Sequence, residues 1–362
     1  MHLRWDGVWQ RPHHILSRLS RRVPVIVIEE PFILEGEERD EIRHDGNVTI
    51  IRPIRTPLPD GPFVDARTIA TTRGLLDGAQ PTLWLYQPLM LALADAFAEA
   101  PLVYDCMDDL GAFAFAPDRL REDETLLLER AYWVFCGGRT LYEARRSFGE
   151  KVKLYPSGVD FTFFAAARSL APHPLVQVLP RPRYGYVGVI DERLDYGLID
   201  ALSADAGNPT IIMIGPVMKI DAAQLPRKPN VHFTGKQPYA AIPSILAGLD
   251  VALMPFALNA STRAISPTKT LEYLAAGLPV VSTPISDVVT DYGGVVTIAE
   301  GAEFLKAAAR LCHPEPFDSA RYARYAQDRL RRGMQIAELH DWQSIVDRMW
   351  ADVASVSGLP QR

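Results

Sequence analysis

The amino-acid sequence predicts an α/β protein of two doubly wound domains, and three observations support this prediction. Short apolar runs alternate with segments of helical periodicity along most of the 362 residues. The apolar runs are continuous, which is typical of parallel strands that are buried on both faces. Prolines at positions 172, 174, 180 and 182 interrupt the pattern and indicate a stiff linker at residues 169–183.

The first domain is expected at residues 1–168. Its predicted strands are Val23–Glu29, Val48–Arg52, Leu83–Gln87, Leu102–Asp105, Val134–Gly137 and Val152–Tyr155. Its predicted helices are Pro12–Arg22, Asp65–Gly78, Leu89–Ala98, Asp118–Ala131 and Arg139–Phe148. Residues 1–7 contain almost no apolar run, so either the fold lacks its opening strand or the reading frame starts late.

The second domain is expected at residues 184–335. Its predicted strands are Tyr184–Val189, Thr210–Ile214, Val231–Thr234, Val251–Met254, Val280–Thr283 and Val295–Ile298. Its predicted helices are Gly197–Ala204, Tyr239–Ala247, Lys269–Ala276 and Glu303–Leu311. Residues 336–362 form a final region in which the helix Trp342–Val353 is expected to cross back and brace the first domain.

Composition excludes several classes of function. The net charge of −6 gives no support to a nucleic-acid role. No apolar run approaches the roughly 20 residues that span a bilayer, and no signal peptide is visible. Cys106, Cys136 and Cys312 are scattered among apolar segments, which favours a reducing, cytoplasmic location. No Cys/His spacing predicts a zinc site.

The most informative stretch is residues 266–283, which is predicted to be a loop, a helix, a turn and a buried strand. Ser266 and Pro267 suit a helix start, and Gly277 suits its end. Thr268 and Lys269 lie at the first turn, and Glu272 follows three residues later on about the same face. A cation and a carboxylate there suit a ligand with both phosphate and hydroxyl groups, such as a sugar nucleotide.

A loop rich in tryptophan and arginine, residues 4–14, lies where the first strand would meet the first helix. Such loops carry ligands in doubly wound sheets, so we expect it to face phosphate or an acceptor. Two alternatives stay open. The tryptophans could form an interdomain contact. The arginines at positions 11, 18, 21 and 22 could instead dock an apolar helix face on an anionic membrane.

Three further segments follow predicted strand ends. Asp105, Asp108 and Asp109 could hold a metal, perform acid–base work or act as turn residues. Arg193, beyond Gly188, could hold a diphosphate or pair with a nearby aspartate. Gly235 could let a base lie against the backbone or mark an ordinary turn. Neither GxGxxG nor GxxxxGK[ST] occurs, which removes the main support for dinucleotide and P-loop functions.

Taken together, four motifs resemble those of GT-B glycosyltransferases, close to glycosyltransferase family 4 and its bacterial cell-surface polysaccharide members. They are Trp9–His14, Tyr104–Asp109, Tyr155–Asp160 and Pro267–Ser282, and the resemblance covers nearly the whole chain. It implies two Rossmann-like domains facing across a cleft, with acceptor bound by the first and a nucleoside diphosphate sugar by the second. It also implies transfer with retention and without a metal or other cofactor.

The resemblance implies site residues, each of which is an expectation. Glu272 matches the second glutamate of the E-x7-E motif, which holds ribose hydroxyls, whereas the first position is Ala264. Arg193 alone remains of the usual basic pair, with Tyr196 near the place of the lysine. The expected catalytic set is Asp108, Arg193 and Lys269. The expected donor-binding set is Gly188, Arg193, Gly235, Ser266, Pro267, Thr268, Lys269 and Glu272. The expected acceptor-binding set is Trp5, Gln10, Arg11, His14 and Asp109.

The predicted function is sugar transfer to a glycan, a lipid-linked acceptor or another polysaccharide-pathway acceptor, in the cytoplasm or peripherally on the inner face of the membrane. The nearest alternative is a sugar-nucleotide epimerase of the same fold. A second alternative is a non-catalytic homologue that binds a nucleotide sugar, which the changes at Ala264 and Tyr196 favour.

Overall fold

The computed structural model describes residues 3–7, 9–56, 63–112, 116–221, 223, 225–312 and 319–357. The chain divides into two compact units. The first comprises Met1–Pro156 with Trp342–Arg362, and the second comprises Ser157–Asp341. This division differs from the expected linker at residues 169–183. Phe164, Ala167 and Val176 are buried in the core of the second unit, so the proline-rich stretch is part of that unit.

The first unit contains two four-stranded sheets. One has the order β1–β4–β2, with β3 antiparallel to β4. The other is parallel, with the order β5–β6–β7–β8. The strands are β1 Val25–Ile28, β2 Phe32–Ile33, β3 Arg39–Asp45, β4 Val48–Arg55, β5 Leu83–Leu85, β6 Leu102–Cys106, β7 Trp133–Cys136 and β8 Val152–Leu154. Trp5, Val27, Tyr86, Val103 and Phe135 share one apolar core.

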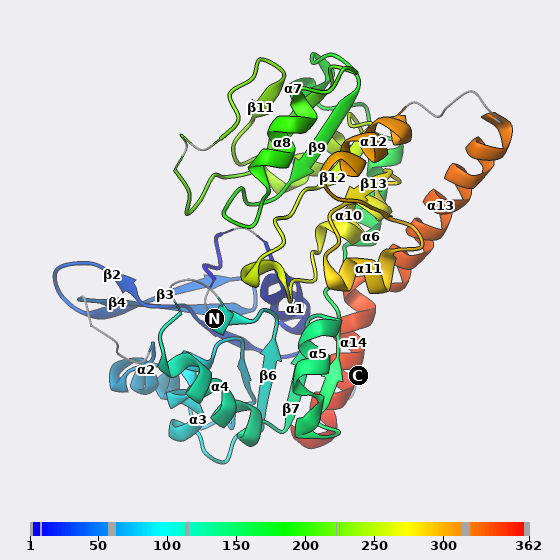
Figure 1. The fold of residues 1–362 in the computed structure, drawn as a ribbon. Helices are drawn as coiled ribbons and strands as arrows, with labels where there is room; N and C mark the ends of the chain where they lie inside the picture. Colours follow the sequence, from blue (N-terminus) through cyan, green and yellow to red (C-terminus); the bar gives the residue numbers. More distant parts are fainter. Residues whose placement is uncertain are drawn as a thin grey trace. The chain divides into compact units, whose positions relative to one another are not determined.

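Helices cover these sheets (Figure 1). They are α1 Arg11–Leu19, α2 Ala66–Leu76, α3 Ala92–Ala96, α4 Arg119–Arg130, α5 Arg139–Arg145 and α14 Trp342–Ser357, with short 3₁₀ turns at Pro88–Met90, Leu110–Ala112 and Arg146–Phe148. The last helix, α14, packs on α1, and the ring of Trp342 stacks on His14 at 5.1 Å. The C-terminal helix therefore belongs to the core of the first unit.

Leu3–Gly7 form bends and a turn and no strand, in agreement with the missing apolar run at this place. The short strand β2 was not predicted. Strand β3 was not predicted, because five of its seven residues are charged and it shows no apolar run. It pairs with β4 along its whole length, from Arg39 opposite Ile54 to Asp45 opposite Val48.

The second unit is built on a six-stranded parallel sheet with the order β11–β10–β9–β12–β13–β14. Its strands are β9 Arg183–Val187, β10 Thr210–Ile214, β11 Val231–Phe233, β12 Val251–Met254, β13 Val280–Ser282 and β14 Thr297–Ile298. The order runs outward in opposite directions from β9 and β12, as in a dinucleotide-type Rossmann sheet. In such sheets ligands bind beyond the carboxyl ends of the two strands where the order reverses.

The helices of the second unit are α6 Phe161–Ala165, α7 Pro174–Gln177, α8 Tyr196–Ser203, α9 Ile242–Leu246, α10 Lys269–Ala275, α11 Ser286–Tyr292, α12 Gly301–Cys312 and α13 Ser319–Leu339, with 3₁₀ turns at Ala166–Arg168, Tyr239–Ala241 and Ala260–Thr262. Helix α10 lies beside α13 (Figure 1). Their contact is close, because a Cβ on Gly333 would lie 2.7 Å from Leu274 Cδ2. None of the helices within the described ranges is long and apolar enough to cross a bilayer.

Candidate functional site

Three glycines follow the carboxyl ends of neighbouring strands in the second unit. Gly188 follows β9, Gly215 follows β10, and Gly235 lies two residues beyond β11. The amide of Gly188 donates to the carbonyl of Ile214 at 2.9 Å, and the amide of Gly215 donates to the carbonyl of Gly235 at 3.1 Å. An added Cβ would lie 2.6 Å from the hydroxyl of Tyr186 at Gly188, whereas at Gly235 it would meet nothing within 4 Å.

Gly215 is required by close packing as well as by backbone conformation. Its φ is +149°, and an added Cβ would lie 1.8 Å from the carbonyl oxygen of Gly188. Sequence reasoning selected Gly188 and Gly235 but missed Gly215. The Gly-Pro pair directly after the strand Thr210–Ile214 was the signal that could have found it.

The loop after β9 holds Arg193 in a fixed position. Its Nε lies 3.0 Å from Asp191 Oδ1, and its Nη2 lies 2.7 Å from Asp191 Oδ2. The carbonyl of Arg193 accepts from the amide of Ala257 at 2.8 Å, which ties this loop to the loop after β12. Arg193 thus lies at the point where the strand order reverses, but its guanidinium is already paired with a carboxylate.

Lys269 and Glu272 are partners on α10. Lys269 Nζ donates to both carboxylate oxygens of Glu272, at 3.0 and 2.8 Å. The side chains are 24% and 10% exposed. Thr268 is the N-cap of this helix and makes no side-chain capping bond, so Ser266 is not the cap that the sequence predicted. Gly277 ends the segment with φ +75°, as predicted.

Tyr186 and Tyr273 connect α10 to the end of β9. Tyr273 Oη accepts from the amide of Val187 at 2.7 Å. Burial raises the pKa of Tyr186, and that hydroxyl also feels the charges of Arg193, Asp191 and Glu272. The structure therefore brings Arg193 and Glu272 to the same end of the sheet. Ser266 and Pro267 lie half-buried in the loop before α10.

In the first unit, Arg11 forms a buried ion pair with Asp105 at the end of β6. Arg11 Nε lies 2.8 Å from Asp105 Oδ1, and the side chains are 1% and 0% exposed. Arg11 Nη1 also donates to the carbonyl of Tyr155 at 2.7 Å, and Trp84 Nε1 donates to Asp105 Oδ2 at 3.2 Å. Burial raises the pKa of Asp105, and the positive charge of Arg11 only partly offsets this effect.

Three expected acceptor residues are buried in the first unit, because Trp5, Arg11 and His14 are each 8% exposed or less. Trp5 Nε1 donates to Asp45 Oδ2 at 2.8 Å, and His14 stacks on Trp342. Their burial does not support the expectation that they contact an acceptor directly. Gln10 is the N-cap of α1, and its amide donates to His13 Nδ1 at 3.1 Å.

Residues beyond β6 form a second polar group. Arg145 Nη2 lies 2.8 Å from Glu124 Oε1 and 3.8 Å from Asp109 Oδ1. Asp109 is 41% exposed and can reach a ligand, whereas Arg145 is 9% exposed. The carbonyl of Asp108 accepts a weak bond from Cys106 Sγ at 3.7 Å. The catalytic role of Asp108 and the acceptor role of Asp109 stay predictions.

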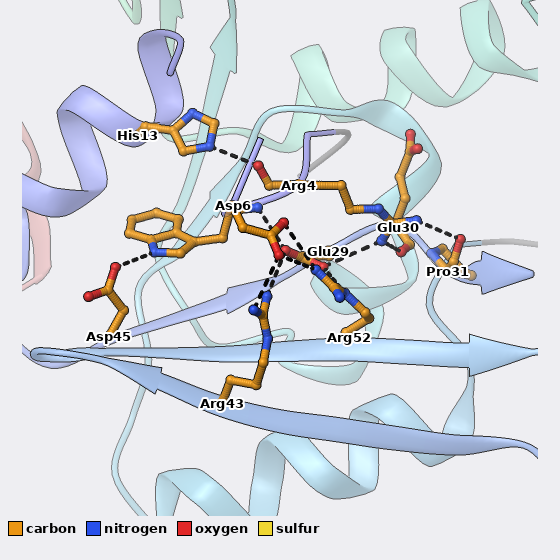
Figure 2. A network of polar contacts seen from close by, with 10 residues as sticks. Arg4, Asp6, His13, Glu29, Glu30, Pro31, Arg43, Asp45 and Arg52 are labelled. Carbon is orange, nitrogen blue, oxygen red and sulfur yellow. Dashed lines mark hydrogen bonds and ion pairs between the residues drawn. The ribbon is translucent and has the colours of Figure 1, made fainter. Parts of the chain in front are cut away.

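A cluster of arginines around Glu29 was not predicted (Figure 2). Glu29 follows β1, and its side chain is fully buried. It accepts from the amide of Trp5 at 2.7 Å and from Arg52 Nε at 2.7 Å, with Arg4 Nη1 at 3.4 Å. We call Arg4, Arg43 and Arg52 the arginine cluster. Sequence reasoning missed it because Arg43 lies on the unpredicted strand β3.

Two negative results concern metals and membranes. The described part of the chain contains no group of three or more His, Cys, Asp or Glu side chains arranged to hold a metal ion.

Two of the arginines that could have faced a membrane make contacts within the first unit. Arg18 Nη1 donates to the carbonyl of His14 at 3.1 Å, and Arg22 Nη2 lies 2.6 Å from Asp347 Oδ1 on α14.

Comparison with known proteins shows which proteins share this architecture. Residues 181–313, which span most of the second unit, match the family described as glycosyl transferases group 1. TuaH of Bacillus subtilis (strain 168), whose name describes a glycosyltransferase of teichuronic acid biosynthesis, is 26% identical over 238 residues. The match covers 61% of this chain and 59% of TuaH, so the chain matches less than two thirds of that relative.

Solved structures match more of the chain at lower identity. Sucrose-phosphate synthase from Thermosynechococcus elongatus is 14% identical with a TM-score of 0.69, covering 96% of this chain and 93% of that one. A structure described as trehalose-6-phosphate from E. coli is bound with UDP-2-fluoro glucose and is 11% identical to this chain. Its TM-score is 0.69, and the match covers 98% of both chains. Anabaena HepE in complex with UDP is 19% identical with a TM-score of 0.59, covering 80% and 82%. The chain therefore has the GT-B fold, and its second unit is related in sequence to the group 1 glycosyl transferases.

Proposed function

We propose that the protein is a glycosyltransferase that moves a sugar from a UDP-sugar to an acceptor of a polysaccharide pathway, with retention and without a metal. The observation that carries this proposal is the position of α10. Its Lys269–Glu272 pair lies on the helix that Tyr273 ties to the end of β9, in the segment that matches the glycosyl transferase family.

The proposed donor site uses the charges at the strand ends. Arg193 and Lys269 stabilise the negative charge that builds on the leaving diphosphate, and Glu272 binds the ribose hydroxyls. The backbone of Gly235, where an added Cβ would meet nothing within 4 Å, allows the nucleotide to approach closely. Lys269 and Glu272 hold each other in the unliganded site and exchange partners when the nucleotide binds. Asp108 contacts the transferred sugar or the acceptor.

We propose UDP as the nucleotide of the donor, and a pathway that uses acidic or phosphorylated sugars, because of the ligands and names of the relatives. HepE was solved with UDP, and with UDP and glucose. The E. coli relative holds a UDP-sugar, and a Burkholderia xenovorans trehalose-phosphate synthase holds glucose-6-phosphate. TuaH is named for teichuronic acid biosynthesis. We propose a glycan or lipid-linked acceptor met in the cytoplasm or at the inner membrane face.

Calorimetry with UDP and GDP tests the donor site. We expect UDP to bind, and Lys269→Ala to weaken the binding about tenfold, since a hydrogen bond to a charged group contributes about 1.5–3 kcal/mol. Lys306→Ala is a matched control, because Lys306 also pairs with a glutamate three residues away, Glu303, on the exposed face of α12. Equal effects of the two substitutions would contradict the assignment of Lys269.

The two alternatives give different results in the same system. A sugar-nucleotide epimerase would change the configuration of a UDP-sugar with no acceptor present. A non-catalytic homologue would bind UDP, or nothing, and would neither transfer nor hydrolyse the sugar. We expect transfer to require an acceptor and the product to keep the anomeric configuration of the donor.

A further inference from the structure

The three arginines of the arginine cluster share a small set of carboxylates in the first unit (Figure 2). Its ion pairs reach two acidic side chains, Glu29 and Asp6. Three guanidinium groups therefore face two carboxylates. A third carboxylate close by, that of Asp45, accepts from Trp5 Nε1 at 2.8 Å. The carboxylate of Glu30 accepts from Gln87 Nε2 at 3.0 Å, so Asp45 and Glu30 are hydrogen-bonded to neighbouring side chains.

The two carboxylates are held very differently. Glu29 is fully buried and accepts bonds of 2.7 Å from the amide of Trp5 and from Arg52 Nε. Asp6 is 55% exposed, and its oxygens lie 3.3 Å from Arg43 Nη1 and 3.3 Å from Arg52 Nη2. These are long distances for charge-assisted hydrogen bonds, which are usually 2.7–2.9 Å. Glu29 is thus a fixed part of the structure, whereas Asp6 is loosely held.

Arg43 is the least satisfied member of the cluster. Its Nε and Nη2 are closed off from solvent and have no hydrogen-bond partner in the described part of the chain. The nearest carboxylate oxygen to Nη2 is Glu29 Oε1, at 3.6 Å. Buried donors without partners are costly, so a group that accepts from Arg43 would be stabilising. Asp6 contacts Nη1 of the same guanidinium group at 3.3 Å.

We propose that the arginine cluster binds an anionic group of the acceptor, a carboxylate or a phosphate carried on a sugar, and that Asp6 occupies its place until it binds. Arg43 and Arg52 form the bidentate contacts that planar guanidinium groups make with such anions. His13 Nε2 contacts the carbonyl of Arg4 at 2.9 Å and His13 stacks on Trp9, whose ring is 42% exposed. This aromatic surface suits the sugar ring beside the anion. The inference rests on the proposed function, because it names the class of acceptor.

Calorimetry at low ionic strength tests the inference with three probes, D-glucuronate, D-glucose 6-phosphate and neutral D-glucose. We expect the two anionic sugars to bind and glucose to bind at least about tenfold more weakly. Comparison of the first two distinguishes a carboxylate from a phosphate. Binding should weaken as salt is added, because the charges at this site are partly exposed.

Two substitutions should act in opposite directions. Arg43→Met should weaken binding of the anionic sugars about tenfold or more. Asp6→Asn should strengthen it severalfold, since it removes the competing carboxylate. Arg39→Met is the matched control, because Arg39 lies on the same strand and pairs with Glu41 on the exposed surface. None of the three should change UDP affinity, and urea unfolding shows whether the first unit of each variant is folded.

Equal binding of glucose and the anionic sugars would overturn the inference. So would equal effects of Arg43→Met and Arg39→Met, or weaker binding in Asp6→Asn. Failure of the proposed function would look different, because the unsubstituted protein would then not bind UDP at all. If UDP bound and only neutral acceptors received sugar, the proposed function would stand and this inference alone would fail.

Discussion

Tyr273 and Val187 are 86 residues apart in the sequence, yet the hydroxyl of Tyr273 accepts a hydrogen bond from the amide of Val187 at 2.7 Å. Both residues are buried. Val187 is the last residue of β9, directly before Gly188, and Tyr273 follows Glu272 on α10. This bond therefore fixes the helix with the two charged donor-site candidates against the strand end that carries the glycine.

Tyr273→Phe should lower both stability and nucleotide affinity. The substitution leaves the buried amide of Val187 without this acceptor, which costs about 1–3 kcal/mol. It also frees α10 to shift, so UDP affinity should fall severalfold. Urea unfolding and calorimetry measure the two effects. Tyr325→Phe is the control, since Tyr325 is 54% exposed; similar losses in both variants would contradict the role given to the bond.

Arg11→Met should destabilise the first unit strongly. The substitution leaves Asp105 as a buried carboxylate without its charged partner, which costs about 3–5 kcal/mol. Adding Asp105→Asn should recover part of the loss, because the amide is neutral and its oxygen can still accept from Trp84. Unfolding of the single and double variants measures this coupling. A double variant no more stable than Arg11→Met would show that the charge is not the cause.

The same pair predicts a pH dependence. The pKa of Asp105 is raised from its ordinary value of 3.8 by burial, so the folded state binds this proton more tightly than the unfolded state. The contribution of Asp105 to stability therefore falls as the pH rises from about 3.8 through the raised folded pKa. In Arg11→Met the pKa should rise further, so the deficit of this variant should shrink on acidification. Unfolding midpoints measured from pH 4 to pH 8 test this, and a deficit independent of pH would contradict it.

The sequence predicted the elements whose patterns are local and apolar. Strands such as Thr210–Ile214 and Val251–Met254 have the predicted bounds, because each is a continuous apolar run buried on both faces. The order β11–β10–β9–β12 could not be read from these runs, since strand order depends on pairing between distant segments. Strand β3 was missed for a related reason. It is held by its register with β4 and not by an apolar pattern of its own.

The sequence identified several residues of the candidate site, but it did not reveal which residues they pair with. Lys269 and Glu272 were predicted to lie on about the same helix face as contacts to a ligand, but their pairing with each other depends on rotamers that the sequence does not encode. Arg11 was predicted to contact an acceptor or a membrane, and its ion pair with Asp105 was missed because the two residues are 94 positions apart. The arginine cluster depends on three arginines from separate segments, one of them on the unpredicted β3. Long-range ion pairs are thus the part of the site that sequence patterns reveal least.

Glu272→Ala should weaken UDP binding through the ribose hydroxyls. We expect a loss of about tenfold for UDP, because two hydrogen bonds to a carboxylate are removed. A UDP analogue without the 2′ and 3′ hydroxyls should bind the native protein more weakly and should be almost insensitive to the substitution. Calorimetry with both ligands forms a cycle that isolates this contact. The control is Glu303→Ala, whose carboxylate is exposed on α12. An equal loss for both ligands would place Glu272 elsewhere on the nucleotide.

Gly215→Ala should damage both the fold and the donor site of the second unit. The new methyl group would lie 1.8 Å from the carbonyl oxygen of Gly188, so one of the two strand ends must move. The φ of +149° adds strain of about 1–3 kcal/mol for any other residue. We expect a loss of stability above about 2 kcal/mol and a loss of UDP affinity that exceeds the effect of Lys269→Ala. Gly294→Ala is the control, because a Cβ there meets nothing within 4 Å. Unfolding and UDP titration of the two variants measure these effects. If the close approach of Gly215 to Gly188 were incidental, Gly215→Ala would be as stable as Gly294→Ala and would bind UDP equally well.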